Sequence, residues 1–189
     1  MKEINALCVF CASRQGNNPK FETETKMLGL ELAKENIRLI YGGGARGLMG
    51  TIAKSVLDHG GKVTGIIPEF LIQYELKYEG LDEMIVTQDM HERKRLLAEK
   101  SDGFVILPGG MGTLEEVTEQ ITWLELHLHD KPIVFANIDG YWQPFFDLIN
   151  HMEENGVARK GLLSSLLICD KIEDIIPKLK GITHAPNLD

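Results

Sequence analysis

Residues 103–116 read GFVILPGGMGTLEE, and this segment gives the clearest indication of the fold. Its first five residues form a short apolar run, which is typical of a strand buried on both faces of a parallel sheet. The glycines that follow free successive backbone N–H groups, and Thr113 and Glu116 have the spacing of a helix-capping box. Because a helix N-terminus carries about half a positive charge, the stretch predicts a strand, an anion-binding loop and a helix.

The same alternation of apolar runs and helical periods continues along the chain. Strands are expected at residues 4–11, 37–41, 62–67, 83–87, 103–107, 132–136 and 166–169. Helices are expected at residues 21–35, 48–59, 90–100, 113–128, 141–154 and 171–179. Repeated βαβ units favour parallel strands, so we expect one Rossmann-like, doubly wound α/β domain over residues 1–189, with helices on both faces. Ligands of such folds bind outside the carboxyl ends of the strands.

Composition and charge exclude several classes of protein. The 189 residues are 43% hydrophobic and 25% charged, which is too apolar for a disordered chain. A formal charge of −8 argues against a nucleic-acid polymer or an anionic membrane as partner. No apolar run approaches the roughly 18 residues of a membrane span, and residues 1–5 lack the pattern of a signal peptide. With only three cysteines, we expect a cytoplasmic protein.

A second glycine cluster, Tyr41 to Gly50 (YGGGARGLMG), follows the second expected strand. It satisfies the G-x-G-x-x-G pattern, and Glu69 lies at about the spacing of the acidic residue in a dinucleotide-binding site. Three consecutive glycines meet many patterns by chance, so a nicotinamide or flavin site is only one reading. An anion- or nucleotide-binding loop of another kind is favoured, and a tight turn is the structural alternative.

Several segments together resemble one family. PGGMGTLEE resembles the P-G-G-x-G-T-x-x-E motif of the LONELY GUY (LOG) family, whose members were long labelled as possible lysine decarboxylases. MHERK (residues 90–94) is similar to its M-x-x-R-K segment, and YGGGARGLMG to its G-G-G-x-x-G-L-M-G loop. VFCAS (residues 9–13) resembles the V-F-C-G-S opening, with Ala12 in place of glycine. The resemblance covers residues 4–170.

The resemblance implies a reaction and a set of site residues. Family members hydrolyse the N-glycosidic bond of nucleoside 5′-monophosphates, such as AMP or a cytokinin riboside 5′-monophosphate, with no metal or organic cofactor. They form homodimers or larger homo-oligomers. Carried over to this sequence, the catalytic pair is Arg93 and Glu116. The expected substrate-binding residues are Ser13, Gly43, Gly44, Glu75, Lys94, Gly109, Gly110, Met111, Gly112, Thr113, Glu115 and Thr122.

The chemistry of glycoside cleavage agrees with these roles. Positive charge builds on the ribose ring as the bond breaks, and a fixed carboxylate such as Glu116 stabilises it and orients the attacking water. Glu115 points about 100° away on the helix, which suits a ribose-hydroxyl contact or a solvated face. Arg93 supplies a permanent cation for the departing base. It could instead orient the phosphate or pair with Glu116, and the sequence does not choose among these roles.

Three further patterns carry less weight. Cys8 and Cys11 form C-x-x-C, but residues three apart on a strand face opposite sides, so buried packing is favoured over a metal or redox pair. His127 and His129, near Asp130, are explained more simply by a helix end than by a metal site. Thr122 and Trp123 lie off the apolar stripe of their helix, which suggests a dimer face.

Two other functions compete with glycoside hydrolysis. The main alternative is a non-catalytic nucleotide-binding or sensing protein on the same fold, followed by a nicotinamide-dependent oxidoreductase. Lysine decarboxylation is disfavoured because no lysine stands in a context that suggests a Schiff base with pyridoxal phosphate.

Overall fold

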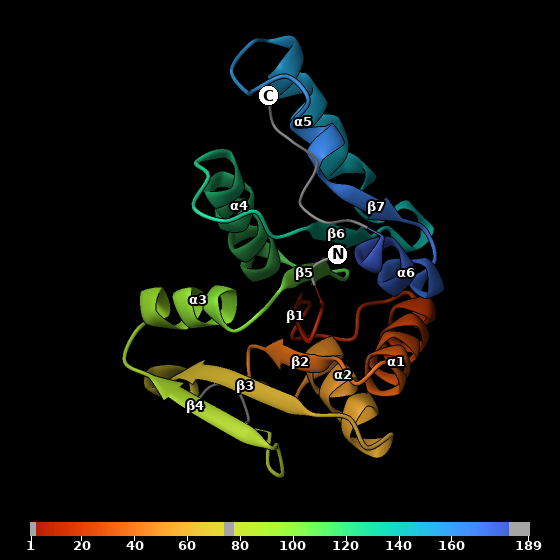
Figure 1. Cartoon of the computed structure of the whole chain (residues 1–189), viewed down its shortest axis with the longest axis vertical. Helices are drawn as coiled ribbons and strands as arrows, with labels where there is room; N and C mark the ends of the chain where they lie inside the picture. The colour runs from red at the N-terminus through yellow and green to blue at the C-terminus, as the bar shows by residue number, and fades with distance from the viewer. Residues whose placement is uncertain (1–2, 74–77, 182–189) are drawn as a thin grey trace.

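The computed structural model describes residues 3–73 and 78–181. Seven strands form one parallel sheet in the order β4-β3-β2-β1-β5-β6-β7 (Figure 1). The strands are β1 (Ala6–Phe10), β2 (Arg38–Tyr41), β3 (Val63–Pro68), β4 (Glu83–Thr87), β5 (Gly103–Ile106), β6 (Ile133–Ala136) and β7 (Leu167–Cys169). Every neighbouring pair is parallel, as the apolar runs predicted.

Helices cover both faces of the sheet, which confirms the doubly wound class. They are α1 (Pro19–Lys34), α2 (Gly47–Asp58), α3 (Met90–Glu99), α4 (Met111–Glu125), α5 (Gln143–Glu154) and α6 (Ile175–Lys180). Helices α1, α2 and α6 pack on one face, whereas α3, α4 and α5 pack on the other (Figure 1). On β1, Leu7 and Val9 join the first layer, while Cys8 and Phe10 join the second, as the two-residue period of a strand requires.

The topological switch point lies between β1 and β5, the strands at which the chain order reverses. The helix that follows β1 lies on one face of the sheet, and the helix that follows β5 lies on the other. The two strand ends stay connected: Leu107 N–H donates to the Phe10 carbonyl at 3.0 Å, and Ala12 N–H donates to the Pro108 carbonyl at 3.1 Å. The loops after β1 and β5 therefore form the two sides of a cleft.

The ends of α4 differ from the sequence prediction. The helix begins at Met111 with Gly110 as its N-cap and no side-chain cap, so the predicted capping box of Thr113 and Glu116 is wrong. It ends at Glu125, and Leu128 is 66% exposed instead of continuing the apolar stripe. The reason is a left-handed residue, His127, with φ 56°, which turns the chain without a glycine or proline to signal it.

Three other element boundaries in the structure also differ from those expected from the sequence. Helix α5 starts at Gln143, because a 3₁₀ turn at Ile138–Gly140 precedes it. The last expected helix divides into a 3₁₀ turn, Ile172–Asp174, and α6. Pro68 is the last residue of β3, paired in register with Thr87, instead of stopping the strand before it. Among the residues that the structure describes, no helix is long and apolar enough to cross a membrane.

Candidate active site

A cavity of about 830 Å³ opens at the switch point. Residues 11–18 after β1 and residues 108–113 after β5 form two of its walls. Leu48 and Met49, at the start of α2, and Phe21 and Tyr141 complete the apolar part of the lining. Arg14, in the wall after β1, and Arg93 and Glu116, from α3 and α4, are the charged residues of the lining. The cavity therefore lies where a doubly wound fold binds its ligand.

The glycine loop after β5 presents free backbone donors to this cavity. The N–H groups of Met111, Gly112 and Thr113 stand in the first turn of α4, where an α-helix offers them no acceptor. A Cβ atom on Gly110 or Gly112 would meet nothing within 4 Å, so a ligand has room beside the backbone at both positions. A Cβ on Gly109 would lie 2.2 Å from Thr113 Oγ1, so glycine is required there for packing. The loop has the geometry of an anion site.

Arg93 and Glu116 form a buried ion pair, with Arg93 Nη1 at 3.3 Å from Glu116 Oε1. Their side chains are only 8% and 11% exposed. Arg93 is fixed further by a hydrogen bond from its Nε to the Ile66 carbonyl at 3.2 Å. Gly42 makes room for the guanidinium, because a Cβ there would lie 2.3 Å from Arg93 Nη2. Of the roles left open by the sequence, pairing with Glu116 is the one that the structure displays.

Lys94, the next residue on α3, is directed to a different part of α4. Its Nζ lies 2.5 Å from Glu115 Oε1 and 2.9 Å from Glu119 Oε1. Burial alone would lower the pKa of Lys94, but the hydrogen bonds to Glu115 and Glu119 outweigh it and raise that pKa above its ordinary value of 10.5. Neither Lys94 nor Glu115 lines the cavity. Both residues thus join α3 to α4.

The remaining residues expected at the site are divided between the cavity and its surroundings. Ser13 lines the cavity. Gly43 and Gly44 do not line it; Gly43 is left-handed, with φ 78°, and packs beside Ile67 and Met84.

Thr122 is exposed on α4, where its hydroxyl donates to the Thr118 carbonyl at 2.8 Å. Glu75 lies outside the described residues.

Two aromatic residues at the cavity received no role from the sequence. Tyr141 donates its hydroxyl to the Gly109 carbonyl at 2.6 Å, and its ring meets that of Phe21 edge-on, with centroids 5.3 Å apart. Tyr141 follows the carboxyl end of β6 and Phe21 follows that of β1. Ligand sites of parallel sheets lie beyond the carboxyl ends of the strands, so this rule could have identified both residues from the sequence.

The thiols near the cavity are not suited to nucleophilic chemistry. Cys8 and Cys11 are free, buried and on opposite faces of the sheet, as the spacing predicted. Burial, together with the negative charge of Glu116, raises the pKa of both thiols well above the usual range, so they stay protonated. Within residues 3–73 and 78–181, no group of three or more His, Cys, Asp or Glu side chains could hold a metal ion.

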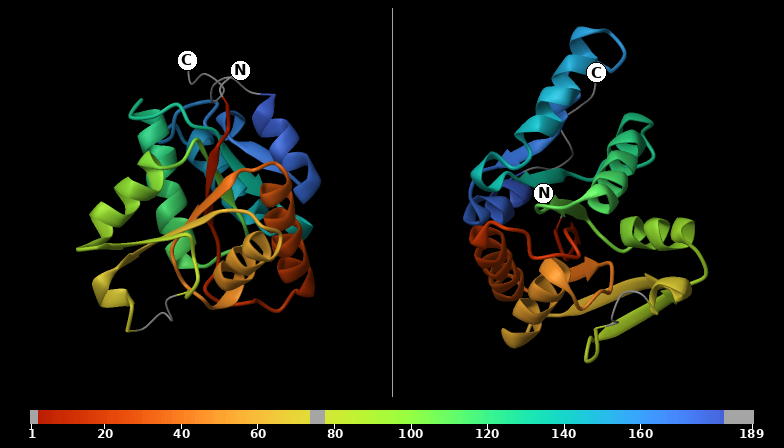
Figure 2. Two further views of the ribbon diagram at one scale, coloured as in Figure 1. Left: turned by 60° about the horizontal axis from the view of Figure 1, so that its bottom comes forward. Right: turned by 180° about the vertical axis from the view of Figure 1, so that it is seen from behind.

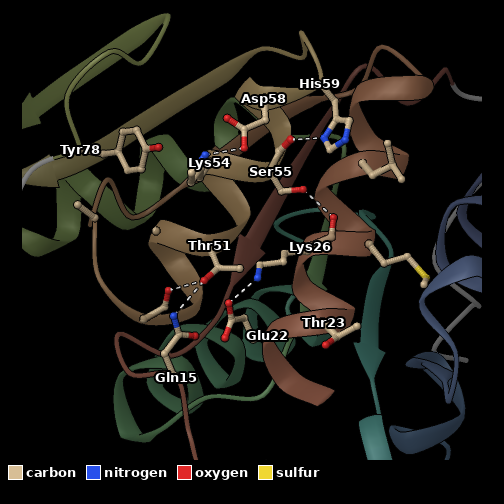
Figure 3. A pocket seen from close by; sticks show the side chains of 15 residues that line it. Gln15, Glu22, Thr23, Lys26, Thr51, Lys54, Ser55, Asp58, His59 and Tyr78 are labelled. Atoms are coloured by element: carbon tan, nitrogen blue, oxygen red, sulfur yellow. Dashed lines mark hydrogen bonds and ion pairs between the residues drawn. The ribbon is translucent and has the colours of Figure 1, made fainter. Parts of the chain in front are cut away.

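A second cavity, of about 850 Å³, lies between α1 and α2 (Figure 3). These two helices run side by side on the same face of the sheet (Figure 2, right). The charged groups of this cavity are paired with one another: Lys26 lies 2.5 Å from Glu22, and Lys54 lies 2.6 Å from Asp58 (Figure 3). Neither Arg93 nor Glu116 lines it. The cavity at the switch point is therefore the candidate active site.

The fold and this cleft define a Rossmann-type α/β protein with a glycine-rich helix N-terminus beside a buried arginine–glutamate pair. Residues 49–179 match the protein-family model described as "Possible lysine decarboxylase". The cytokinin riboside 5′-monophosphate phosphoribohydrolase LOG3 of Arabidopsis thaliana is 41% identical over 178 residues, covering 94% of this chain and 83% of the relative. The cytokinin riboside 5′-monophosphate phosphoribohydrolase of Rhodococcoides fascians is 40% identical, covering 93% and 89%. The chain belongs to this LOG family.

Solved structures with the same fold are more distant in sequence. The molybdenum cofactor binding protein of Rippkaea orientalis is 22% identical, with a TM-score of 0.71 over 96% of this chain and 98% of that one. The molybdenum cofactor carrier protein of Chlamydomonas reinhardtii is 19% identical, with a TM-score of 0.70 over 95% and 98%. At such identities, the likeness establishes the fold alone.

Proposed function

We propose that this chain hydrolyses the N-glycosidic bond of nucleoside 5′-monophosphates, such as AMP or a cytokinin riboside 5′-monophosphate, to the free base and ribose 5-phosphate. The printed names of relatives about 40% identical support this reaction. One geometric observation carries it: the buried Arg93–Glu116 pair faces the same cavity as the free N-terminus of α4, with Glu116 about one helical turn beyond the glycine loop.

The glycine loop would hold the 5′-phosphate. The N–H groups of Gly110, Met111, Gly112 and Thr113 and the positive end of the α4 dipole favour an anion, while Gly109 gives the loop its close packing on Thr113. Ser13, on the opposite wall, would contact the nucleotide from the loop after β1. With the phosphate at the loop, the ribose would extend toward Glu116, about one helical turn further along α4.

Glu116 is the proposed catalytic carboxylate. As the bond between the anomeric carbon and the base nitrogen breaks, positive charge grows on the ribose, and the carboxylate stabilises that charge. The same group orients a water molecule for attack on the anomeric carbon. The oxygen of water forms the new bond, the base nitrogen keeps the electron pair of the old one, and the proton released by water neutralises the base.

Arg93 has two roles in this proposal. Its guanidinium orients the Glu116 carboxylate in a buried position, where an unpaired charge would be costly. Its permanent charge would also stabilise the negative charge that develops on the departing base.

Base release is the direct test. The purified protein is incubated with AMP, and the products are separated by chromatography. We expect adenine and ribose 5-phosphate in equal amounts. Calorimetry that detects tight binding of AMP without any release of adenine would instead make the chain a non-catalytic nucleotide-binding protein. Extending the assay to other monophosphates and to a cytokinin riboside 5′-monophosphate identifies the preferred base.

We also infer that the chain forms a homodimer or a larger homo-oligomer. Exposed apolar side chains after α4 and on α5, among them Leu126, Leu128 and Leu148, support an interface between copies. Light scattering of the purified protein tests this: a single species with the mass of one chain, at the concentrations used for the assay, would contradict it.

A further inference from the structure

Tyr141 reaches the candidate site through an unusual turn. Asp139 and Gly140 both have left-handed backbones, with φ of 52° and 74°. Aspartate tolerates this conformation better than most residues other than glycine, and contacts of its side chain also hold Asp139 in place. The Asp139 carboxylate accepts hydrogen bonds from Asn18 Nδ2 at 2.9 Å and from Lys20 Nζ at 2.7 Å. The turn after β6 is thereby tied to the start of α1.

The ring of Tyr141 is fixed on two sides. It meets Phe21 edge-on, and it meets Trp142 edge-on with centroids 5.1 Å apart. Trp142 is itself buried, and its backbone N–H donates to Asn137 Oδ1 at 2.9 Å. The hydroxyl of Tyr141 consequently has a defined position, 2.6 Å from the Gly109 carbonyl oxygen.

That carbonyl belongs to the peptide between Gly109 and Gly110, which is the first peptide of the anion site. In a trans peptide, the carbonyl of one residue and the N–H of the next point in opposite directions. A hydrogen bond that fixes the Gly109 carbonyl therefore also fixes the direction of the Gly110 N–H. With glycine on both sides, this peptide has more backbone freedom than any other residue pair would allow, so an external restraint has a large effect.

We propose that Tyr141 is a positioning residue that fixes the Gly109–Gly110 peptide, so that the backbone donors at the start of α4 are arranged for a phosphate before the ligand binds. Preorganised donors bind an anion better than donors that must first reorient. The proposal rests on the function proposed above, because it assigns the anion to the phosphate of the substrate. Tyr141 acts through the glycine loop, and the Tyr141 hydroxyl does not need to contact the substrate.

The experiment compares two tyrosine-to-phenylalanine variants. Tyr141→Phe removes the hydroxyl and keeps the ring that packs on Phe21 and Trp142. Tyr41→Phe is the matched control, because the Tyr41 hydroxyl is buried and has no hydrogen-bond partner among the described residues. Calorimetry measures the binding of ribose 5-phosphate and of adenosine to each protein, and thermal unfolding checks that each is folded.

We expect Tyr141→Phe to bind ribose 5-phosphate about five- to tenfold more weakly than the wild type, the effect of one lost hydrogen bond. Adenosine, which has no phosphate, should bind both proteins equally. In the AMP assay, KM should rise by the same factor with little change in kcat. Tyr41→Phe should match the wild type in all three measurements.

Two results would overturn the inference and leave the proposed function standing. One is unchanged binding of ribose 5-phosphate by a folded Tyr141→Phe protein. The other is an equal loss for ribose 5-phosphate and adenosine, which would show that the ring and not the peptide had been disturbed. A wild-type protein that neither binds ribose 5-phosphate nor releases adenine from AMP would contradict the proposed function and this inference together.

Discussion

The guanidinium of Arg93 lies 3.3 Å from the carboxylate of Glu116, although the two residues come from different helices, α3 and α4. Both side chains are about nine-tenths buried, yet both face the switch-point cavity. A buried ion pair is weak evidence for stability, because desolvation offsets much of its attraction. The pair at the cleft is better explained by chemistry, and the proposed reaction uses both charges.

Glu116→Gln should abolish most of the activity while the protein remains folded. The amide that replaces the carboxylate can still accept a hydrogen bond from Arg93, but it lacks the charge that stabilises the ribose cation and cannot accept a proton. We expect kcat for adenine release to fall by about 10²- to 10⁴-fold. Glu99→Gln is the matched control, since Glu99 is exposed on α3 and its variant should retain full activity. Equal rates for the two variants would remove Glu116 from the catalytic role.

Gly42→Ala should impair catalysis without changing a charged residue. The added methyl would lie 2.3 Å from Arg93 Nη2, and the guanidinium would have to leave its present position beside Glu116. A displacement of about 1 Å in a catalytic group can reduce the rate by roughly 100-fold, so we expect kcat to fall by at least tenfold. Gly181→Ala is the control, because its nearest neighbours lie at 3.5 Å. Wild-type kcat in a folded Gly42→Ala protein would show that the position of Arg93 does not matter.

Gly112→Ala should affect stability and binding in opposite directions. Gly112 lies in the first turn of α4 and a Cβ there meets no protein atom within 4 Å, so alanine should stabilise the helix by up to about 1 kcal/mol. The same methyl would enter the space assigned to the phosphate. The free energy of unfolding, measured in urea, should therefore stay equal or rise, while KM for AMP increases. An unchanged KM would place the phosphate away from Gly112.

Asp139→Asn should show that the charge of Asp139 stabilises the turn after β6 in a pH-dependent way. The hydrogen bond from Lys20, and then that from Asn18, lowers the pKa of Asp139 below its ordinary value of 3.8. A lowered folded-state pKa stabilises the fold above the unfolded-state pKa, and this stability is lost as pH falls through the folded-state value. Asparagine tolerates the left-handed backbone but carries no charge.

Urea midpoints of the wild type and Asp139→Asn, measured across pH, check this linkage. We expect the wild type to be the more stable protein by a constant amount between pH 7 and pH 5. The difference should shrink only below about pH 4, as Asp139 takes up its proton. A difference that is the same at every pH would mean that Lys20 does not interact with the charge of Asp139.

Most of the fold could be predicted from local patterns. Runs such as GFVIL at residues 103–107 identify a buried strand without tertiary information, because no charge interrupts them. Helix ends were less accurate where the chain turns without the usual residues. Gly110 caps α4 with no side-chain hydrogen bond, and His127 turns the chain in a left-handed conformation that no neighbouring glycine announces.

The candidate site could be predicted only in part. The resemblance to the LOG family supplied Arg93 and Glu116 as the expected catalytic pair, but the ion pair between them depends on how α3 packs against α4. The same packing directs Lys94 toward Glu115 and Glu119, which no spacing along one helix reveals. The contact of Tyr141 with Gly109 joins residues 32 apart in sequence and also requires the tertiary structure.

In the proposed complex, the N-terminus of α4 holds a phosphate while Glu116 faces the anomeric carbon of the attached ribose. A crystal structure of the Glu116→Gln protein with AMP tests it most directly. We expect phosphate oxygens about 3 Å from the backbone nitrogens of residues 110–113, with the substituted side chain at position 116 beside the ribose. A phosphate bound elsewhere, or a side chain at position 116 that points away from the sugar, would contradict it.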